Sequence, residues 1–284
     1  MTSLLEVDAV TASYGGMPVV RDVSLRVEQG DVLGLVGESG SGKTTLGLCV
    51  LGLLPEYATI HGKILFEGRD LVAMPEKEKR ALRGERVSAV FQNPMSSLDP
   101  AFTIGDQIAE VFHAHREMSR AQAREGAVRL LREVGIPAPE ARLKSYPHEL
   151  SGGMNQRVAI AIALALNPSL LIADEPTSAL DVTVQAQILG LLRTLIGEHA
   201  GAVLLITHDL GVVAQLCNRV AVMYAGEVVE EAPVRQLFAE PAHDYTKQLL
   251  ASLPGRARRH AAVAAVDGRR PHRGNGTTSG EVEA

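Results

Sequence analysis

The residues best suited to chemistry in this chain of 284 residues lie in a glycine-rich stretch at positions 37–45. Its G-x-x-x-x-G-K-T spacing is typical of a phosphate-binding loop, in which glycines let backbone N–H groups turn toward an anion. Lys43 can reach β- and γ-phosphate oxygens, and the Thr44 hydroxyl can bind Mg²⁺. A glycine-rich turn without a ligand is the alternative. The predicted nucleotide-binding set is Gly37, Glu38, Ser39, Gly40, Ser41, Gly42, Lys43, Thr44 and Thr45.

Two adjacent carboxylates follow an apolar run at 170–173 that is expected to be a strand. Ligands of α/β proteins bind at the carboxyl ends of such strands. Asp174 is therefore expected to hold Mg²⁺ through water, and Glu175 to deprotonate the water that attacks the γ-phosphate. Two acids that merely begin a loop at Pro176 are the alternative. The presence of Lys43 in the same chain favours the catalytic interpretation.

A third segment, Ser151-Gly152-Gly153, precedes a helical pattern over 156–166, so its N–H groups can face an anion. A simple helix N-cap is the alternative, and it would be preferred if the segment stood alone. The phosphate loop already serves the nucleotide of this chain. The segment is therefore of interest mainly in combination with the other two.

Together the three segments resemble the nucleotide-binding subunits of ATP-binding cassette (ABC) transporters, from about Leu4 to Leu253. The resemblance implies an ATPase that uses ATP and Mg²⁺. It also implies that Ser151, Gly152 and Gly153 contact the ATP bound by a second ATPase subunit, in a homodimer or a pair with a paralogue. The chain departs from the family at Asn155, where Arg, Lys or Gln is more usual. We expect this difference to tune function without abolishing it.

Three further residues take roles from the resemblance. Gln92 would sense Mg²⁺ and the attacking water, and His208 would hydrogen-bond the γ-phosphate. Tyr14 would stack on adenine, with ordinary packing as the alternative. Residues 178–181 resemble the loop through which the two ATP sites communicate, or alternatively form a helix cap. The predicted catalytic set is Glu175, His208 and Gln92, and the predicted metal set is Thr44, Gln92 and Asp174.

Short apolar runs alternate with longer helical patterns, which predicts an α/β fold with a mostly parallel sheet. The family resemblance specifies a P-loop NTPase of ABC type with an antiparallel β part. Residues 103–157 have a helical texture and are interpreted as an inserted helical subdomain, within an ATP-binding domain over 1–254. Residues 255–284 carry many arginines among Gly, Pro and Thr, which predicts a disordered tail. The expected strands are 32–36, 87–91, 170–173, 202–207, 219–224 and, after a turn at 225–226, 227–229. The expected helices are one that follows the glycine loop through Leu54, 104–115, 120–134 with a cap at Ser119, 182–199, 234–238 and 245–252.

Composition excludes several classes of protein. The net charge of −5 argues against a nucleic-acid partner, and 46% hydrophobic residues suffice for a substantial core. Two cysteines, Cys49 and Cys217, do not make a disulfide framework and fit a reducing cytosol. The sequence shows neither a signal peptide nor an apolar run long enough to span a membrane, so we expect membrane contact only through partners.

Two stretches resemble the ABC subgroup that imports dipeptides, oligopeptides and nickel: 91–100, where such subunits dock a permease, and 241–247. This implies a peripheral protein on the cytoplasmic face of the membrane, bound to two transmembrane permease subunits and served indirectly by an extracytoplasmic binding protein. An accessory ATPase of a soluble complex such as carbon–phosphorus lyase is the alternative. A chromosome or DNA-repair ATPase is disfavoured because neither a long coiled-coil insertion nor zinc-binding cysteines are present. Many peptide-type members of this subgroup end in a cysteine-rich segment that holds an iron–sulfur cluster. No cysteine follows Cys217 in this sequence, so such a cluster is excluded.

Overall fold

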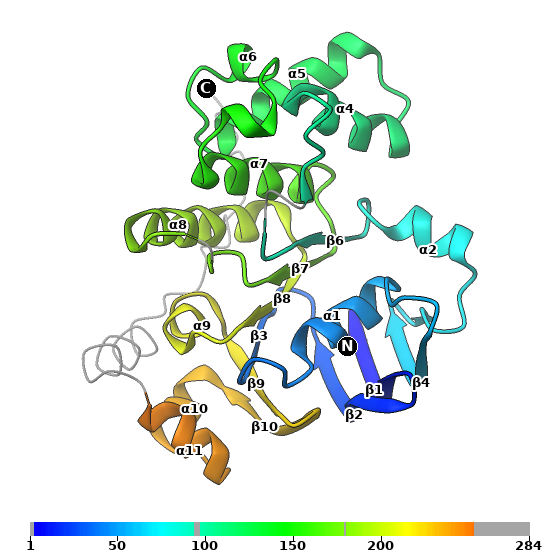
Figure 1. Cartoon of the computed structure of the whole chain (residues 1–284), viewed down its shortest axis with the longest axis vertical. Helices are drawn as coiled ribbons and strands as arrows, with labels where there is room; N and C mark the ends of the chain where they lie inside the picture. The colour runs from blue at the N-terminus through cyan, green and yellow to red at the C-terminus, as the bar shows by residue number, and fades with distance from the viewer. Residues whose placement is uncertain (1–2, 94–96, 179, 253–284) are drawn as a thin grey trace, which may run out of the picture.

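The computed structural model describes residues 3–93, 97–178 and 180–252. A six-stranded sheet has the order β10-β9-β3-β8-β7-β6, in which all neighbours are parallel except the antiparallel pair β9 and β10 (Figure 1). The predicted α/β class with a mostly parallel core is confirmed. The strands are β3 (Val32–Val36), β6 (Val87–Val90), β7 (Leu170–Asp174), β8 (Ala202–Thr207), β9 (Arg219–Tyr224) and β10 (Glu227–Pro233).

Both faces of this sheet are buried, which explains why its strands are continuous apolar runs. Along β7, Leu170 and Ile172 pack into one hydrophobic cluster, whereas Leu171 and Ala173 pack into another on the opposite face. The strands are in register, with Val36 opposite Thr207. Because parallel strands end at the same edge, the segments that follow β3, β6, β7 and β8 are brought together there.

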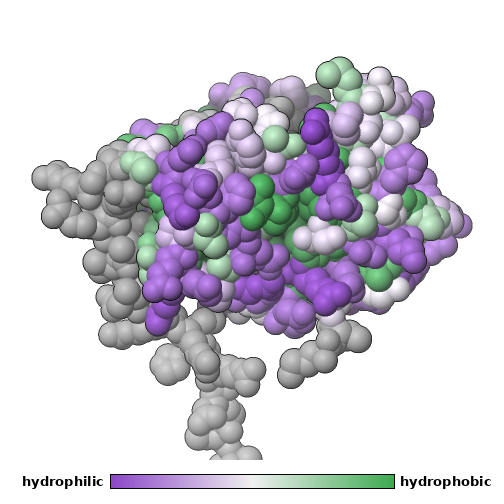
Figure 2. All heavy atoms as spheres, turned by 90° about the horizontal axis from the view of Figure 1, so that it is seen from below, coloured by the Kyte–Doolittle hydropathy of each residue, from purple (hydrophilic) through white to green (hydrophobic). Residues whose placement is uncertain are grey.

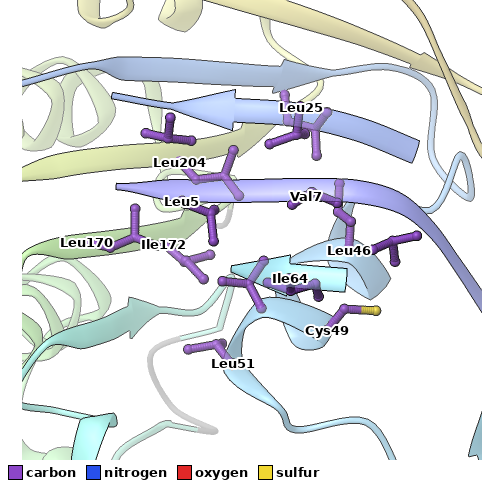
Figure 3. Packing of buried hydrophobic residues seen from close by; sticks show 14 of the residues in the cluster. Leu5, Val7, Leu25, Leu46, Cys49, Leu51, Ile64, Leu170, Ile172 and Leu204 are labelled. Atoms are coloured by element: carbon purple, nitrogen blue, oxygen red, sulfur yellow. The ribbon is translucent and has the colours of Figure 1, made fainter. Parts of the chain in front are cut away.

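A second sheet, with the order β2-β1-β4-β5, is antiparallel and packs with helix α1 (Lys43–Leu51) on one face of the core sheet. Figure 3 shows Leu46 and Cys49 of α1 among side chains of both sheets, including Ile64 of the antiparallel sheet and Ile172 of the core sheet. Leu46 is fully buried. The strands are β1 (Leu5–Tyr14), β2 (Met17–Val27), β4 (Ala58–Phe66) and β5 (Arg69–Asp70).

Helix α1 is shorter than the helix through Leu54 that the sequence predicts. Gly52 has a φ of 62° and closes the helix, and its N–H donates to the carbonyl oxygen of Cys49. Glycine adopts this left-handed conformation without steric cost, so it is a natural helix stop. Burial raises the pKa of the Cys49 thiol to about 12, so this cysteine is an inert packing group.

Several helices gather at one end of the molecule and cover the second face of the core sheet (Figure 1). Ser119 caps α5 through a reciprocal capping box with Gln122, and Gly135 follows the helix with a φ of 71°. The cap predicted at Ser119 is thus present. These elements are α4 (Ile104–His115), α5 (Arg120–Glu133), α6 (Pro139–Arg142), η1 (Pro147–Glu149), α7 (Gly152–Leu164) and α8 (Val182–His199). A separate helix, α2 (Glu76–Leu82), precedes β6.

The last described elements form a third cluster around the β9–β10 hairpin. Ala225 and Gly226 both have positive φ, at 48° and 93°, as a tight hairpin turn requires. Helices α9 (Leu210–Leu216), α10 (Val234–Ala239) and α11 (Asp244–Ala251) pack there. Figure 2 shows that the face seen from below is largely hydrophilic, with small apolar areas. The predicted tail at 255–284 lies outside the described residues, and among those described no helix is both long and apolar enough to span a membrane.

Candidate active site

The Lys43 ammonium group lies against the inside of the phosphate loop. Its Nζ donates to the carbonyl oxygens of Gly37 at 2.9 Å and Glu38 at 2.8 Å, and only 6% of the residue is exposed. Burial lowers the pKa of Lys43, while the nearby carboxylates of Glu175 and Asp174 act in the opposite direction. A cation held by carbonyl oxygens in this way can turn to the oxygens of a phosphate, which are stronger acceptors.

Two glycines of the loop are required by close backbone contact. A Cβ on Gly37 would lie 2.1 Å from the carbonyl oxygen of Met223, and one on Gly42 would lie 2.7 Å from that of Val19. Gly40 differs, because nothing lies within 4 Å of its Cβ position and only its φ of 82° favours glycine. Gly42 begins α1 without a side-chain cap, so the first N–H groups of the helix stay available for an anion.

Asp174 is buried at the end of β7 beside Thr44 of α1. Burial raises the pKa of the Asp174 carboxyl, and a hydrogen bond from the Thr44 hydroxyl acts against this. Its Oδ1 atom has no hydrogen-bond partner among the described residues. A buried carboxylate oxygen left without a partner is costly, and a hydrated hard cation would satisfy it.

The carboxylate of Glu175 is held from both sides. The Gln92 amide Nε2 donates to its Oε2 at 2.8 Å, and Nδ1 of His208 lies 2.8 Å from its Oε1. Since a carboxylate can only accept, Nδ1 carries the proton in this contact, and 60% of the His208 side chain is exposed. The structure therefore brings together the three predicted catalytic side chains, which follow three different strands.

The backbone at Glu175 is also unusual. Its φ is 45°, in the left-handed region that residues with a side chain rarely adopt, and its N–H donates to the carbonyl oxygen of Ile206 at 2.8 Å. Such a conformation costs about 1–3 kcal/mol and persists only where surrounding structure enforces it. The bond to β8 thus fixes the direction in which the carboxylate leaves the strand.

Ser151 begins α7, and its Oγ accepts the N–H of Met154 at 3.3 Å. No described hydrogen bond joins this segment to the phosphate loop of the same chain. Gly153 packs closely on α8, since a Cβ there would lie 2.8 Å from Val184 Cγ1, whereas a Cβ on Gly152 would meet nothing within 4 Å. At the start of α7 there is therefore free space beside Gly152, whereas the space beside Gly153 is filled by Val184.

The family model described as "ABC transporter" matches residues 20–178. The chain belongs to this family. It is 52% identical over 261 residues to a probable peptide ABC transporter ATP-binding protein of Sinorhizobium fredii, a match that covers 90% of this chain and 78% of that protein. It is also 50% identical to the oligopeptide transport ATP-binding protein OppD of Bacillus subtilis, with 89% and 73% covered.

Solved ABC proteins have the same fold. A dimeric ATP-binding cassette in a post-hydrolysis state, bound to ADP and phosphate, matches with a TM-score of 0.72 and 30% identity over 81% of this chain and 99% of that one. The cbiO1 subunit from Clostridium perfringens, part of an ABC transporter complex, matches with a TM-score of 0.72 and 26% identity over 93% and 99%. The chain is an ABC ATPase, and its predicted antiparallel β part is present.

Asn155, the departure from the usual ABC segment, is fully buried. Its Nδ2 donates to the carbonyl oxygen of Pro147 at 2.9 Å and so ties α7 to η1. The Asn155 side chain therefore has a structural contact within this chain. The effect of Asn155 on activity stays a prediction.

The adenine-stacking role of Tyr14 stays a prediction. Tyr14 ends β1, and its ring centroid lies 6.0 Å from that of Tyr57 at an interplanar angle of 51°. Tyr57 is 70% exposed and was not singled out in the sequence, because a lone aromatic before a strand carries no distinguishing pattern. Asp181 caps α8, because its Oδ1 accepts the N–H groups of Thr183 and Val184.

The two glycines of the Ser151 segment should respond differently to alanine. Gly153→Ala places a methyl group against Val184 and is expected to cost about 1–3 kcal/mol of unfolding free energy. Gly152→Ala meets no neighbour and should leave the unfolding free energy within about 0.5 kcal/mol of the parent. Urea denaturation of the two variants measures the difference, and equal stabilities would contradict the packing described here.

Proposed function

We propose that this ABC ATPase powers the import of dipeptides or oligopeptides. The observation that carries the proposal is the level of identity, about half over nine-tenths of the chain, to proteins named for peptide and oligopeptide transport. The expected setting is the cytoplasmic face of the membrane, on two permease subunits, with an extracytoplasmic binding protein delivering the peptide. The cargo itself would be chosen by those partners.

The proposed chemistry assigns one task to each side chain of the site. Lys43 binds the β- and γ-phosphate oxygens, and Glu175 accepts the proton of the attacking water. Gln92 and His208 would orient the Glu175 carboxylate through the two bonds of 2.8 Å, and His208 would also hydrogen-bond the γ-phosphate. Glu175 thus has a fixed direction, and 17% of its side chain is exposed.

Mg²⁺ fits the residues at the end of β7. Thr44, Asp174 and Gln92 would hold it, directly or through water, and it would neutralise charge on the phosphate oxygens. The unpartnered Oδ1 of Asp174 supports this assignment. Among the described residues no cluster of three His, Cys, Asp or Glu side chains could hold a metal alone. This suits Mg²⁺, which usually takes few protein ligands and shares the phosphates of its nucleotide.

The proposed working unit is a pair of ATPase subunits, either two copies or this chain with a paralogue. Ser151, Gly152 and Gly153 would contact the ATP held by the other subunit. The open position at Gly152 supports this, because a partner's phosphate could approach the start of α7 there. The solved cassette with bound ADP and phosphate is dimeric, in agreement with such a pair.

Mixing two inactive variants tests the crossed arrangement. Lys43→Ala disables the phosphate loop of its own chain, and Ser151→Arg blocks the segment presented to the partner. A mixed dimer contains one site with both defects and one site with neither, so the mixture should regain ATPase activity above either parent. Mixtures that never exceed the parents would contradict the crossed site.

Peptide import is tested in cells that lack the gene for this chain. Uptake of a labelled dipeptide or tetrapeptide should return with the parent chain and not with Glu175→Gln, and two membrane permeases should co-purify with the chain. Co-purification with soluble lyase subunits instead would contradict the import function and favour an accessory ATPase.

A further inference from the structure

A tyrosine of the last described helix reaches the phosphate loop. The hydroxyl oxygen of Tyr245, in α11, accepts the backbone N–H of Glu38 at 3.0 Å. The tyrosine is buried, with 8% exposed, and its ring centroid lies 4.3 Å from that of Tyr224 at the end of β9. Burial raises the pKa of Tyr245, so the phenol stays neutral and accepts the N–H through a lone pair.

Helix α11 is itself fixed to the core sheet at its start. The carboxylate of Glu230, in β10, accepts the N–H groups of Ala242 at 2.8 Å and His243 at 2.9 Å. Burial acts to raise the pKa of Glu230, but the hydrogen bonds from the Ala242 N–H, the Thr246 side chain and the His243 N–H together outweigh it, so the pKa is lowered and the carboxylate stays charged. His243 Nδ1 then caps the helix by accepting the N–H of Tyr245 at 3.1 Å. Tyr245 therefore has little freedom to move away from the loop.

Glu38 is held at both its backbone groups. Its N–H donates to Tyr245, and its carbonyl oxygen accepts the Lys43 ammonium at 2.8 Å. If Lys43 turns to a phosphate and its bond to this carbonyl weakens, the bond from the Glu38 N–H to Tyr245 remains. The bond to Tyr245 can thus hold the loop in shape when the Lys43 ammonium group turns from the loop carbonyls to the phosphate.

We infer that Tyr245 is a positioning residue for the phosphate loop, through which the α10–α11 segment sets the affinity for ATP. Its hydroxyl acts on the loop backbone and does not touch the nucleotide. Glu38 belongs to the predicted nucleotide-binding set, and the same contact means that its N–H is engaged inside the protein. Any contact of Glu38 with nucleotide would involve its other atoms and stays a prediction.

Tyr245→Phe tests the inference because it removes the hydroxyl and keeps the ring against Tyr224. An unpaired Glu38 N–H lets the loop sample other conformations. Part of the binding free energy of ATP is then used to order the loop. We expect the Kd for Mg-ATP of the full chain, measured by isothermal titration, to rise about three- to tenfold. In ATPase assays KM should rise by a similar factor, with kcat changed less than twofold, and the melting temperature without nucleotide should stay near that of the parent.

Tyr224→Phe is the matched control. It removes a neighbouring hydroxyl for which no hydrogen bond is found in the described part of the chain, and the 46% exposure of Tyr224 leaves that group in water. Its Kd for ATP should equal that of the parent. The inference is overturned if Tyr245→Phe leaves the Kd within twofold of the parent, if it lowers only the melting temperature, or if Tyr224→Phe weakens ATP binding equally.

Discussion

Glu175→Gln is expected to lower the rate of ATP hydrolysis about 10²- to 10⁴-fold while ATP binding survives. Glutamine keeps the size of the side chain but cannot accept the proton of the attacking water. It can also accept through only one atom, so the two bonds from Gln92 and His208 cannot both persist unchanged. Steady-state phosphate release at saturating Mg-ATP measures the loss.

The same variant should accumulate as an ATP-dependent dimer on size-exclusion chromatography, because ATP between two subunits would no longer be cleaved. Glu240→Gln serves as the control, since Glu240 is an exposed carboxylate that follows α10. Its hydrolysis rate should equal the parent rate. Hydrolysis by Glu175→Gln at the parent rate would show that another group is the base.

Lys43→Ala should raise the Kd for Mg-ATP about 10- to 100-fold, the loss expected for a charge-assisted bond to phosphate. Removing the buried ammonium group removes its desolvation cost but also its bonds to the carbonyl oxygens of Gly37 and Glu38, and because these effects oppose each other the melting temperature without nucleotide should stay near that of the parent. Isothermal titration and thermal unfolding without nucleotide measure the two effects separately.

Lys63→Ala is the control for Lys43→Ala, because Lys63 is an exposed lysine on β4. It should bind ATP as the parent does. Unchanged Mg-ATP affinity and hydrolysis in Lys43→Ala would contradict the assignment of the phosphate loop.

The sequence predicted the parts of the site that depend on local spacing. The glycine loop, the acids after β7 and the cap at Ser119 each lie within a few residues, and their chemistry can be recognised from residue type. The strands of the core sheet were also predicted closely, because burial on both faces makes them continuous apolar runs. The strand predicted to Phe91 ends at Val90, and the helix predicted to begin at Gln156 begins at Gly152.

The rest depends on contacts between distant segments. β1 pairs with β2 and β4 through irregular registers, which breaks the strict alternation that would identify it, so the antiparallel part rested on the family resemblance alone. The contact between Glu38 and Tyr245 joins residues 207 positions apart. Tyr245 was noticed only within the stretch 241–247, since spacing cannot show which backbone group a distant hydroxyl reaches.

The order of strands in the core sheet also has a consequence for synthesis on the ribosome. β3, which delivers the phosphate loop, pairs with strands that come much later: Val32 lies opposite Val203, and Leu33 opposite Arg219. During translation β3 therefore stays unpaired, with its apolar side chains exposed, until most of the chain has emerged from the ribosome. Such late, long-range pairing is slow and exposes the nascent chain to aggregation. A truncated product that ends before β8 would contain the whole glycine loop and still lack the neighbours that shape it.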